Sequence, residues 1–435
     1  MADLQTEATE LLAGLVRHRT VNPPGAERVL QEELGEILRA AGFTVTLAGR
    51  TPERPNLVAR LDGATDGPVL GLLSHVDTVA ADPAHWRHDP WCGDVIDGEL
   101  WGRGALDMKS QTAAEVAAAV SLASAGWRPE RGTLLVIAVV DEEVGGGDGA
   151  IWLTENHPDL VRCDWLINEG AGAVMPSAGE RLYGVCVAEK GVHRFRLTTH
   201  GAAGHASNPR LGDNALLRLA PLIARLGAAT VQLDPTEAPL RFLTELGLDA
   251  TDPAAALERL RERDVGLANL VDPALGVTFA PTIVRASETI NIIPASASVD
   301  VDCRTPPGIG EEVVLARLAE AIGSPEASGY TVEILERVVG NGSPVDTPLM
   351  ASISRWIERE DPGARTVPVT LPAFTDSRTF RSAFPDCVAY GFFPMRHTTL
   401  DAWWPLIHGA DERIDVRDLG FAASAYRDLI VDLLG

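Results

Sequence analysis

The sequence lacks the features that mark several large classes of protein. Its five cysteines are scattered and contain no Cys-x-x-Cys pair, so neither a disulfide framework nor a thiolate zinc site is expected. No uninterrupted apolar run reaches the roughly 18 residues of a membrane-spanning helix. Only 37 basic side chains oppose 61 acidic ones, giving a formal charge of -24. That balance argues against nucleic acid or an anionic membrane as a partner.

The rest of the composition is typical of a globular protein, with 46% apolar and 23% charged residues. Residues 1–7 contain neither the basic nor the apolar segment of a signal peptide. Together with cysteines expected to stay reduced, this predicts a cytoplasmic location. A chain of 435 residues is long for one hydrophobic core, so we expect two domains.

Short apolar runs alternate with amphipathic helices in the first part of the chain, which predicts an α/β fold with a doubly wound, mostly parallel sheet. After Gly191 the order becomes β-α-β-β-α-β, typical of a small antiparallel sheet covered by two helices. The polar stretch 233–275 has the character of an insertion. After Asn341 the first pattern returns. We therefore expect a catalytic domain at 1–190 and 341–435, interrupted by an inserted α+β domain at 191–340.

Acidic and imidazole side chains directly follow three of the apolar runs. Those runs end in Ser74-His75-Val76-Asp77, in Asp141-Glu142-Glu143 and in Asn168-Glu169. In a parallel sheet the carboxyl ends of the strands meet at one edge, where sites gather. Carboxylates and imidazoles are the ligands of zinc-like divalent metals, so this edge is a predicted metal site.

A hydrolytic site with two metals needs a bridging group, further ligands on each ion, and a base for the attacking water. Asp107 can bridge through its two oxygens, although it could instead cap the Ala-rich helix that follows. Of the neighbours Glu142 and Glu143, one can ligate while the other stays free as the base. A second imidazole is required beside His75, and His408 is the best placed. Asp77 would hold the His75 tautomer.

Together these motifs resemble the co-catalytic zinc metallopeptidases, which include aminoacylase, carboxypeptidase S, glutamate carboxypeptidase, acetylornithine deacetylase and succinyl-diaminopimelate desuccinylase. The matching segments are residues 74–77, 102–109, 141–143, 168–170 and 407–409. The resemblance implies two divalent ions bridged by Asp107, one also bound by His75 and Glu169, the other by Glu143 and His408. It implies Glu142 as the general base. Zinc is expected, and cobalt or manganese suits the same ligands.

The inserted domain resembles the lid and dimerisation domain of that family. The turn 201–207 matches its glycine-rich motif, which implies a homodimer in which His205 polarises the scissile carbonyl in the partner's site. Asn291, Arg304 and Arg378 lie in further matching motifs and become candidates for holding the substrate's amide and carboxylate. Arg304 has an equal alternative as a strand residue paired with a nearby acid. The loop 371–374 departs from the glycine-rich pattern of many relatives.

These features predict a metal-dependent hydrolase that cleaves an amide bond in an N-acyl amino acid or a short peptide with a free carboxylate. The alternative within the same class is a deacylase acting on acetylornithine or succinyl-diaminopimelate. A catalytically inactive binding protein of the same fold is the alternative from another class. The complete set of expected ligands, together with the base, argues against it.

Overall fold

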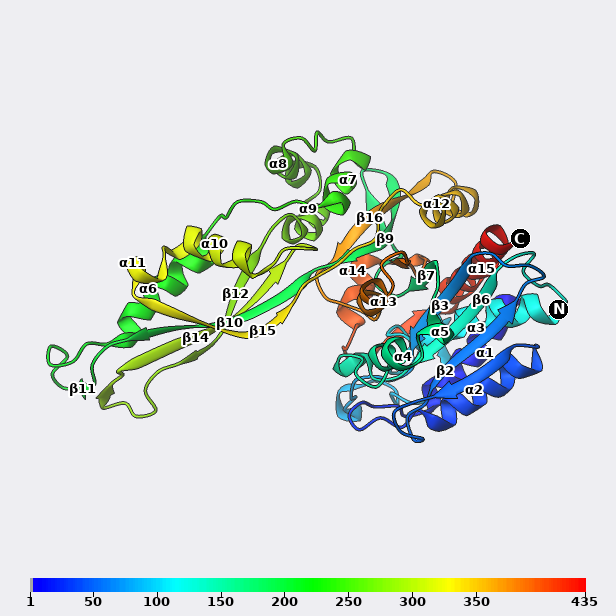
Figure 1. The fold of residues 1–435 in the computed structure, drawn as a ribbon, viewed down its shortest axis with the longest axis horizontal. Helices are drawn as coiled ribbons and strands as arrows, with labels where there is room; N and C mark the ends of the chain where they lie inside the picture. The colour runs from blue at the N-terminus through cyan, green and yellow to red at the C-terminus, as the bar shows by residue number, and fades with distance from the viewer. Residues whose placement is uncertain (1–2) are drawn as a thin grey trace. The chain divides into compact units, whose positions relative to one another are not determined.

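The structure is a computed structural model that describes residues 3–435, and the chain divides into two compact units. The first unit contains the residues up to Val187 together with Ser343–Val369 and Thr375–Gly435. The second contains Ala188–Gly342 and Thr370–Phe374. Each unit has its own sheet (Figure 1). Each also has its own buried apolar cluster.

The first unit is built on a ten-stranded sheet whose centre is parallel. Strands β6, β3, β7 and β17 run parallel to one another, and antiparallel β2 and β9 flank them. The predicted α/β fold with a mostly parallel central sheet is confirmed. The strands in spatial order are β1 (Thr44–Ala48), β2 (Asn56–Asp62), β6 (Thr133–Val139), β3 (Val69–His75), β7 (Trp165–Asn168), β17 (Val388–Gly391), β9 (Glu180–Glu189), β8 (Ala173–Ser177) and β18 (Met395–Thr399), with β16 (Ala364–Leu371) beside β9.

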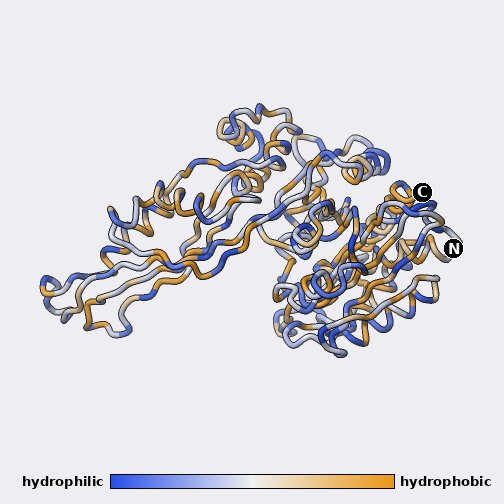
Figure 2. Tube along the Cα trace, viewed as in Figure 1, coloured by the Kyte–Doolittle hydropathy of each residue, from blue (hydrophilic) through white to orange (hydrophobic). Residues whose placement is uncertain are grey.

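Helices cover both faces of this sheet. On one face α1 (Leu4–Arg17), α3 (Lys109–Ser124) and α15 (Val416–Leu434) pack together, and α3 and α15 contact β3 and β6. On the other face α4 (Ala150–Asn156), α5 (Pro158–Val161) and α13 (Ser377–Ala383) share a buried cluster with the strands. Burial on two faces explains why β3 and β6 are almost continuously apolar. Apolar segments accordingly concentrate among these strands (Figure 2).

Two further helices complete the first unit. The helix α2 (Arg28–Ala40) packs on β1 and β2, and α12 (Pro348–Glu360) packs on α15. A small separate sheet joins β4 (Val95–Ile96), β5 (Glu99–Trp101) and β19 (Arg413–Asp415). This sheet connects the segment before α3 with the segment before α15, two regions about three hundred residues apart in the sequence.

The second unit is an antiparallel sheet with two helices on one face. Its order is β12 (Thr278–Arg285), β14 (Ser296–Thr305), β10 (Gly191–His200) and β15 (Tyr330–Val338), covered by α6 (Ala215–Ala228) and α10 (Glu311–Ile322). Phe195 and Val299 face the helices within the buried cluster. Alternate residues carry ion pairs, for example Arg196 with Asp300. The element order is the one expected from the sequence.

The stretch 233–275 is helical in part, as expected from the sequence. It contains α7 (Glu237–Glu245), α8 (Pro253–Arg263) and α9 (Val265–Val271), all within the second unit. The strands β8, β9 and β16 were not expected. Within residues 3–435, the structure has no helix that combines the length and the apolar character needed to cross a bilayer.

Candidate active site

Four predicted site residues lie where neighbouring strands end. His75 is the last residue of β3, and Glu169 directly follows β7. Glu142 and Glu143 open a short 3-10 turn after β6. Since β6, β3 and β7 are adjacent and parallel, their carboxyl ends bring these side chains to one edge of the sheet.

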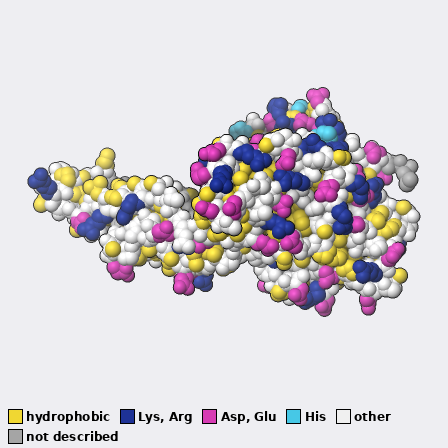
Figure 3. Space-filling model, turned by 90° about the horizontal axis from the view of Figure 1, so that it is seen from above, with side chains coloured by type: hydrophobic (Ala, Val, Ile, Leu, Met, Phe, Trp, Pro, Cys, Tyr) yellow, Lys and Arg dark blue, Asp and Glu magenta, His cyan; other side chains and the backbone are white. Residues whose placement is uncertain are grey.

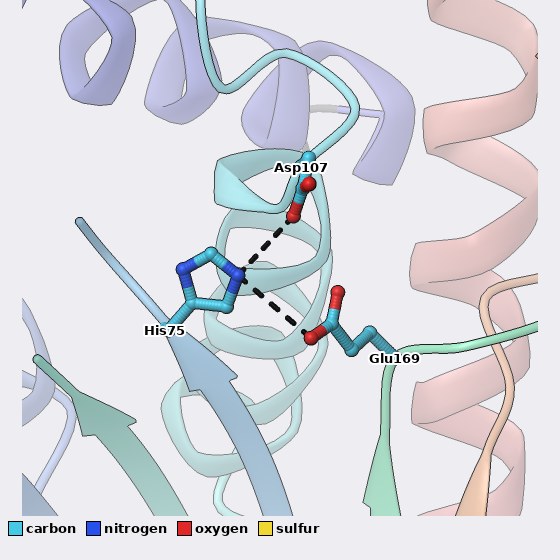
Figure 4. A group of neighbouring side chains, drawn as sticks. All are labelled: His75, Asp107 and Glu169. Carbon is cyan, nitrogen blue, oxygen red and sulfur yellow. Dashed lines mark hydrogen bonds and ion pairs between the residues drawn. The ribbon is translucent and has the colours of Figure 1, made fainter. Parts of the chain in front are cut away.

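Asp107 completes two groups of potential ligands at this edge. It lies in the loop before α3, and no side chain caps the start of that helix, so the capping alternative does not hold. Its Oδ1 lies 3.2 Å from His75 Nε2, which is itself 3.8 Å from Glu169 Oε1 (Figure 4). Its Oδ2 lies 3.1 Å from His408 Nε2, which is also 3.1 Å from Glu143 Oε2. One carboxylate therefore faces a different histidine with each oxygen.

The donor set fits a pair of divalent cations. In both groups, His75-Asp107-Glu169 and Asp107-Glu143-His408, the ligand atoms lie within 4.8 Å of one another. Two imidazoles and three carboxylates form the nitrogen and oxygen ligand set of zinc and related metals. Three carboxylates gathered in a largely buried place also need positive charge to balance them.

Burial and the neighbouring carboxylates shift the pKa values of the titratable side chains at this edge of the sheet. Burial alone would lower the pKa of His75, but the carboxylates of Asp107 and Asp77 raise it well above its ordinary value. Hydrogen bonds that His408 donates to the carboxylates of Asp107 and Glu143 raise its pKa to about 10. Burial, and then the charge of Glu169, raise the pKa of Glu142 well above its ordinary range. Each imidazole thus lies in a strongly negative environment that favours a cation.

Asp77 does more than contact the imidazole of His75. The Nδ1 atom of His75 lies 3.1 Å from the backbone carbonyl of Asp77 and 3.5 Å from its carboxylate. The carboxylate itself accepts the backbone N–H groups of Glu142 and Glu143, both at 3.2 Å. Asp77 therefore holds the turn that carries the two glutamates as well as the histidine.

Three further residues that support this turn, Asn22, Glu27 and Arg54, were missed from the sequence, whereas Asp141 was part of the predicted motif. Asn22 donates to Asp77 at 2.8 Å and to Asp141 at 3.1 Å. Arg54 donates to Asp141 at 2.8 Å and forms a bidentate ion pair with buried Glu27. Asp141 has φ 73°, in the left-handed region that aspartate enters more readily than most residues. Asn22 directly precedes Pro23-Pro24-Gly25. That position was the available sequence signal for its contacts with Asp77 and Asp141.

Within the second unit, His205 and Asn291 lie close together. Short strands β11 (Gly204–His205) and β13 (Ile292–Ile293) pair, with His205 opposite Ile292. The N–H of Ala206 donates to the carbonyl of Asn291 at 3.0 Å. The His205 side chain is exposed, and its Nδ1 lies 2.7 Å from Ser207 Oγ. The two predicted substrate-contacting residues thus share one end of this unit.

Arg304 lies near one end of the four-stranded sheet of this unit, and the segments that lead to His205 and Asn291 leave that sheet at its other end. The register pairs His200 with Ser296 and Val192 with Arg304, so about 26 Å of strand separates these ends at roughly 3.3 Å per residue. Arg304 Nε donates to Asp302 at 2.6 Å and Nη1 to the carbonyl of Pro372 at 3.3 Å. This pairing is the structural alternative considered for Arg304. A substrate role for Arg304, and for half-buried Arg378 at the start of α13, stays a prediction.

Comparison with known proteins identifies the family. Residues 71–432 match the model of peptidase family M20/M25/M40. The chain belongs to this family. It is therefore a metal-dependent peptidase or deacylase, as the strand-end ligands predict. Succinyl-diaminopimelate desuccinylase from Cereibacter sphaeroides is 28% identical over 97% of both chains. The enzyme of the same name from Xanthomonas euvesicatoria is 28% identical over 99% of both chains.

Solved structures of the family share the fold. A metallo-carboxypeptidase from Sulfolobus solfataricus superposes with a TM-score of 0.73 at 17% identity, over 98% of this chain and 99% of its own. Human carnosine dipeptidase 1 superposes with a TM-score of 0.67 at 14% identity, over 99% of this chain and 96% of its own. At these identities the likeness establishes architecture, and the substrate has to be argued from this chain's own residues.

Proposed function

We propose that this protein hydrolyses an amide bond in a small N-acyl amino acid or peptide that carries a free carboxylate. The observation that carries the proposal is the position of Asp107, whose two oxygens face His75 and His408 separately. A carboxylate placed in this way suits a bridge between two cations. We propose zinc as the native metal because imidazole and carboxylate together suit it.

In this proposal Asp107 belongs to both cation sites. His75 and Glu169 would hold one ion with it, and Glu143 and His408 the other. The bound ions would polarise the scissile carbonyl and lower the pKa of the attacking water. Asp107 is largely buried, and hydrogen bonds from His408 and His75 hold its pKa well below its ordinary range although burial opposes this, so it stays ionised.

Glu142 belongs to neither ligand group and is free to move protons. It would accept a proton from the attacking water and return it to the leaving amine. A base that first accepts and then returns a proton works best with a pKa close to the working pH. The raised pKa of Glu142, caused by burial and then by Glu169, supports this role.

We further propose that the active form is a homodimer that shares residues between subunits. In one protomer, the segments that carry His205 and Asn291 join the four-stranded sheet at His200 and Ser296, about 26 Å of strand from Arg304. One small substrate can contact all three only if they come from two copies. The partner's His205 would then polarise the carbonyl, while Arg304 or Arg378 holds the carboxylate.

The surface of the second unit supports such a pairing. The edge strand β12 exposes Ile283 at 48% and Val284 at 53%, and α6 exposes Leu217 at 70%. Hydrophobic side chains are visible on the surface of this unit in Figure 3. An edge strand with unpaired backbone groups and apolar side chains is a natural place for a second copy to pair. A cytoplasmic location, expected from the sequence, stays a prediction.

A second candidate is succinyl-diaminopimelate desuccinylase. It is favoured by relatives of that name that align over nearly the whole chain. A succinyl group carries an additional carboxylate, so this substrate would need a cationic group on the acyl side as well. The same water attack and the same base would serve either substrate.

A metal and substrate panel tests these proposals. The purified protein would be stripped with a chelator, reloaded separately with zinc, cobalt or manganese, and assayed on N-acyl amino acids, dipeptides, acetylornithine and succinyl-diaminopimelate. We expect activity to vanish on chelation and to return with metal. A dominant rate on succinyl-diaminopimelate would select the second candidate. Full activity after complete metal removal would exclude both.

A further inference from the structure

We propose that Arg103 and Glu412 are positioning residues that set the distance between Asp107 and His408. They form a buried ion pair that joins two loops, one carrying the shared carboxylate and the other carrying the second imidazole. The inference rests on the proposed function, because it concerns the cation site that those two ligands would form. No part of it requires either residue to touch the substrate.

Glu412 binds the Asp107 loop through four donors. Its Oε1 accepts the backbone N–H groups of Leu106 at 2.7 Å and Asp107 at 3.0 Å. Its Oε2 accepts the N–H of Gly104 at 3.2 Å and a guanidinium nitrogen of Arg103. The side chain is fully buried, so each of these bonds is shielded from water. The backbone that carries Asp107 is thereby held in one place.

Arg103 extends the same connection to the His408 loop. While Nη1 bonds Glu412, Nη2 donates to the carbonyls of Gly409 at 2.9 Å and His408 at 3.3 Å. Its guanidinium also lies over the ring of Trp86, 5.3 Å from the centroid. With 2% of its surface exposed, Arg103 has little freedom to take another position. Both guanidinium nitrogens therefore connect the Asp107 loop, which carries Arg103, to the loop that carries His408 and Glu412.

His408 needs such support more than the other imidazole does. His75 is the last residue of a buried strand in the centre of the sheet, whereas His408 lies in a loop with its side chain 52% exposed. Its φ of 56° is also in the left-handed region that non-glycine residues seldom adopt. Such a conformation persists only where the surroundings impose it. The carbonyl bonds to Arg103 supply that constraint.

Substitution of Glu412 should weaken the Asp107-Glu143-His408 group specifically. A glutamine keeps one accepting oxygen, and in either orientation its NH2 group faces N–H donors. It would leave either the Asp107 loop or Arg103 unpaired in a buried place. The His75-Asp107-Glu169 group keeps two ligands on strand ends. Loss of an outer hydrogen-bond partner typically weakens metal binding about 10- to 100-fold.

The experiment is a cobalt titration of the full-length, chelator-treated protein, followed by visible absorption and calorimetry. Wild-type protein should bind two equivalents. Glu412→Gln should bind the first equivalent within a few-fold of wild type and the second about 10- to 100-fold more weakly. In the variant, kcat should recover as the cobalt concentration rises, while KM at saturating metal stays close to wild type.

The variant Arg103→Lys provides an independent test of the same inference. Lysine keeps the charge, but its single nitrogen cannot replace two nitrogens that bond the Glu412 carboxylate and the backbone carbonyls of His408 and Gly409 separately. We expect the same selective loss of the second equivalent. If Glu412→Gln does not fold by circular dichroism, Arg103→Lys decides the question alone, and wild-type binding of both equivalents by this variant overturns the inference.

Asp361→Asn is the matched control. Asp361 is a buried carboxylate paired with Arg181 and with the Tyr183 hydroxyl at 2.8 Å, and it bonds neither ligand loop. The variant Asp361→Asn should lower Tm and leave the affinity for both cobalt equivalents unchanged. Equal loss of the second equivalent in this control would mean general destabilisation and would overturn the inference. Failure of wild-type protein to bind two equivalents would overturn the proposed function as well.

Discussion

Asn22 and Asp77, 55 residues apart in the sequence, are joined by a buried hydrogen bond of 2.8 Å. The same side-chain NH2 group donates to Asp141 at 3.1 Å, so it lies between the carboxylates of Asp77 and Asp141. Because Asp77 in turn accepts the N–H groups of Glu142 and Glu143, Asn22 acts on both glutamates through one intermediate. The bond between Asn22 and Asp77 therefore contributes to the position of the proposed base.

Replacing Asn22 should reduce turnover more than it reduces substrate binding. In Asn22→Ala the carboxylates of Asp77 and Asp141 lose the donor between them, and the turn that carries Glu142 is held less firmly. We expect kcat to fall about 10- to 100-fold with a small change in KM, as for other outer partners of a metal site. Steady-state kinetics at saturating metal would measure this. Asn156→Ala, which removes an exposed amide bonded only locally, should leave kcat unchanged.

Substitution of Glu142 and substitution of Glu143 should impair the enzyme in different ways. Glu142→Gln removes the proposed base but no ligand, so we expect kcat to fall at least 100-fold while two cobalt equivalents still bind. Glu143→Gln removes an oxygen that lies 3.1 Å from His408, and we expect it to lose a metal equivalent together with activity. Metal titration and kinetics on both variants separate the roles. Unchanged turnover in Glu142→Gln would refute the mechanism.

A buried acid on α3 should make stability depend on pH. Burial raises the pKa of Glu115 to about 8, although Gln111 donates to it at 2.8 Å. The folded protein therefore keeps a proton that the unfolded chain releases near pH 4.5. Stability from this group is fully present below pH 4.5 and is lost as pH rises toward 8, at up to about 1.4 kcal/mol per unit.

Glu115→Gln tests that pH dependence directly. Glutamine stays neutral and can still accept from Gln111, so Tm of the variant should fall less steeply than that of wild type between pH 5 and 8. The nearby hydroxyl of Tyr426 has a pKa raised well above 10 by burial, so it does not titrate in this window. Parallel plots of Tm against pH for the two proteins would contradict the raised pKa.

Mixing two inactive variants should restore activity if His205 acts in the partner's site. His205→Ala and Glu142→Gln are each expected to be inactive alone. In a randomly reassembled mixture, one site of each mixed dimer has both intact residues, so about a quarter of wild-type activity should return. Activity at the level of the separate variants, in a mixture shown to exchange subunits, would place His205 outside the partner's site.

A charge on the apolar surface of the second unit should separate the subunits. Leu217→Glu combined with Ile283→Lys places charges on α6 and on the edge strand β12, both largely exposed in one protomer. We expect a monomer by light scattering, with unchanged secondary structure and little activity. Val265→Glu, at a residue that is 58% exposed on α9, is the control and should remain dimeric.

The position of the principal candidate ligands could be predicted from the sequence because strand burial and strand ends leave a local signal. The apolar runs before His75 and before Glu142 mark strands buried on both faces, and the polar residues that follow must lie at the sheet's edge. The strands β8 and β9 were missed because they are antiparallel and follow a site residue without a helix between them. They pair with each other as a local hairpin, but their other partners, β17 and β18, are distant in the sequence.

The sequence by itself determined the α/β architecture and the set of residues with metal-binding chemistry, because periodic burial and side-chain type are local properties. The tertiary structure decided which oxygen of Asp107 faces which histidine, and that Asn22, Arg103 and Glu412 hold the ligand loops. It also decided that the segment carrying Asn291 meets the four-stranded sheet of the second unit at the end opposite to Arg304. These relationships depend on strand register and loop contacts between distant segments, which no local pattern encodes.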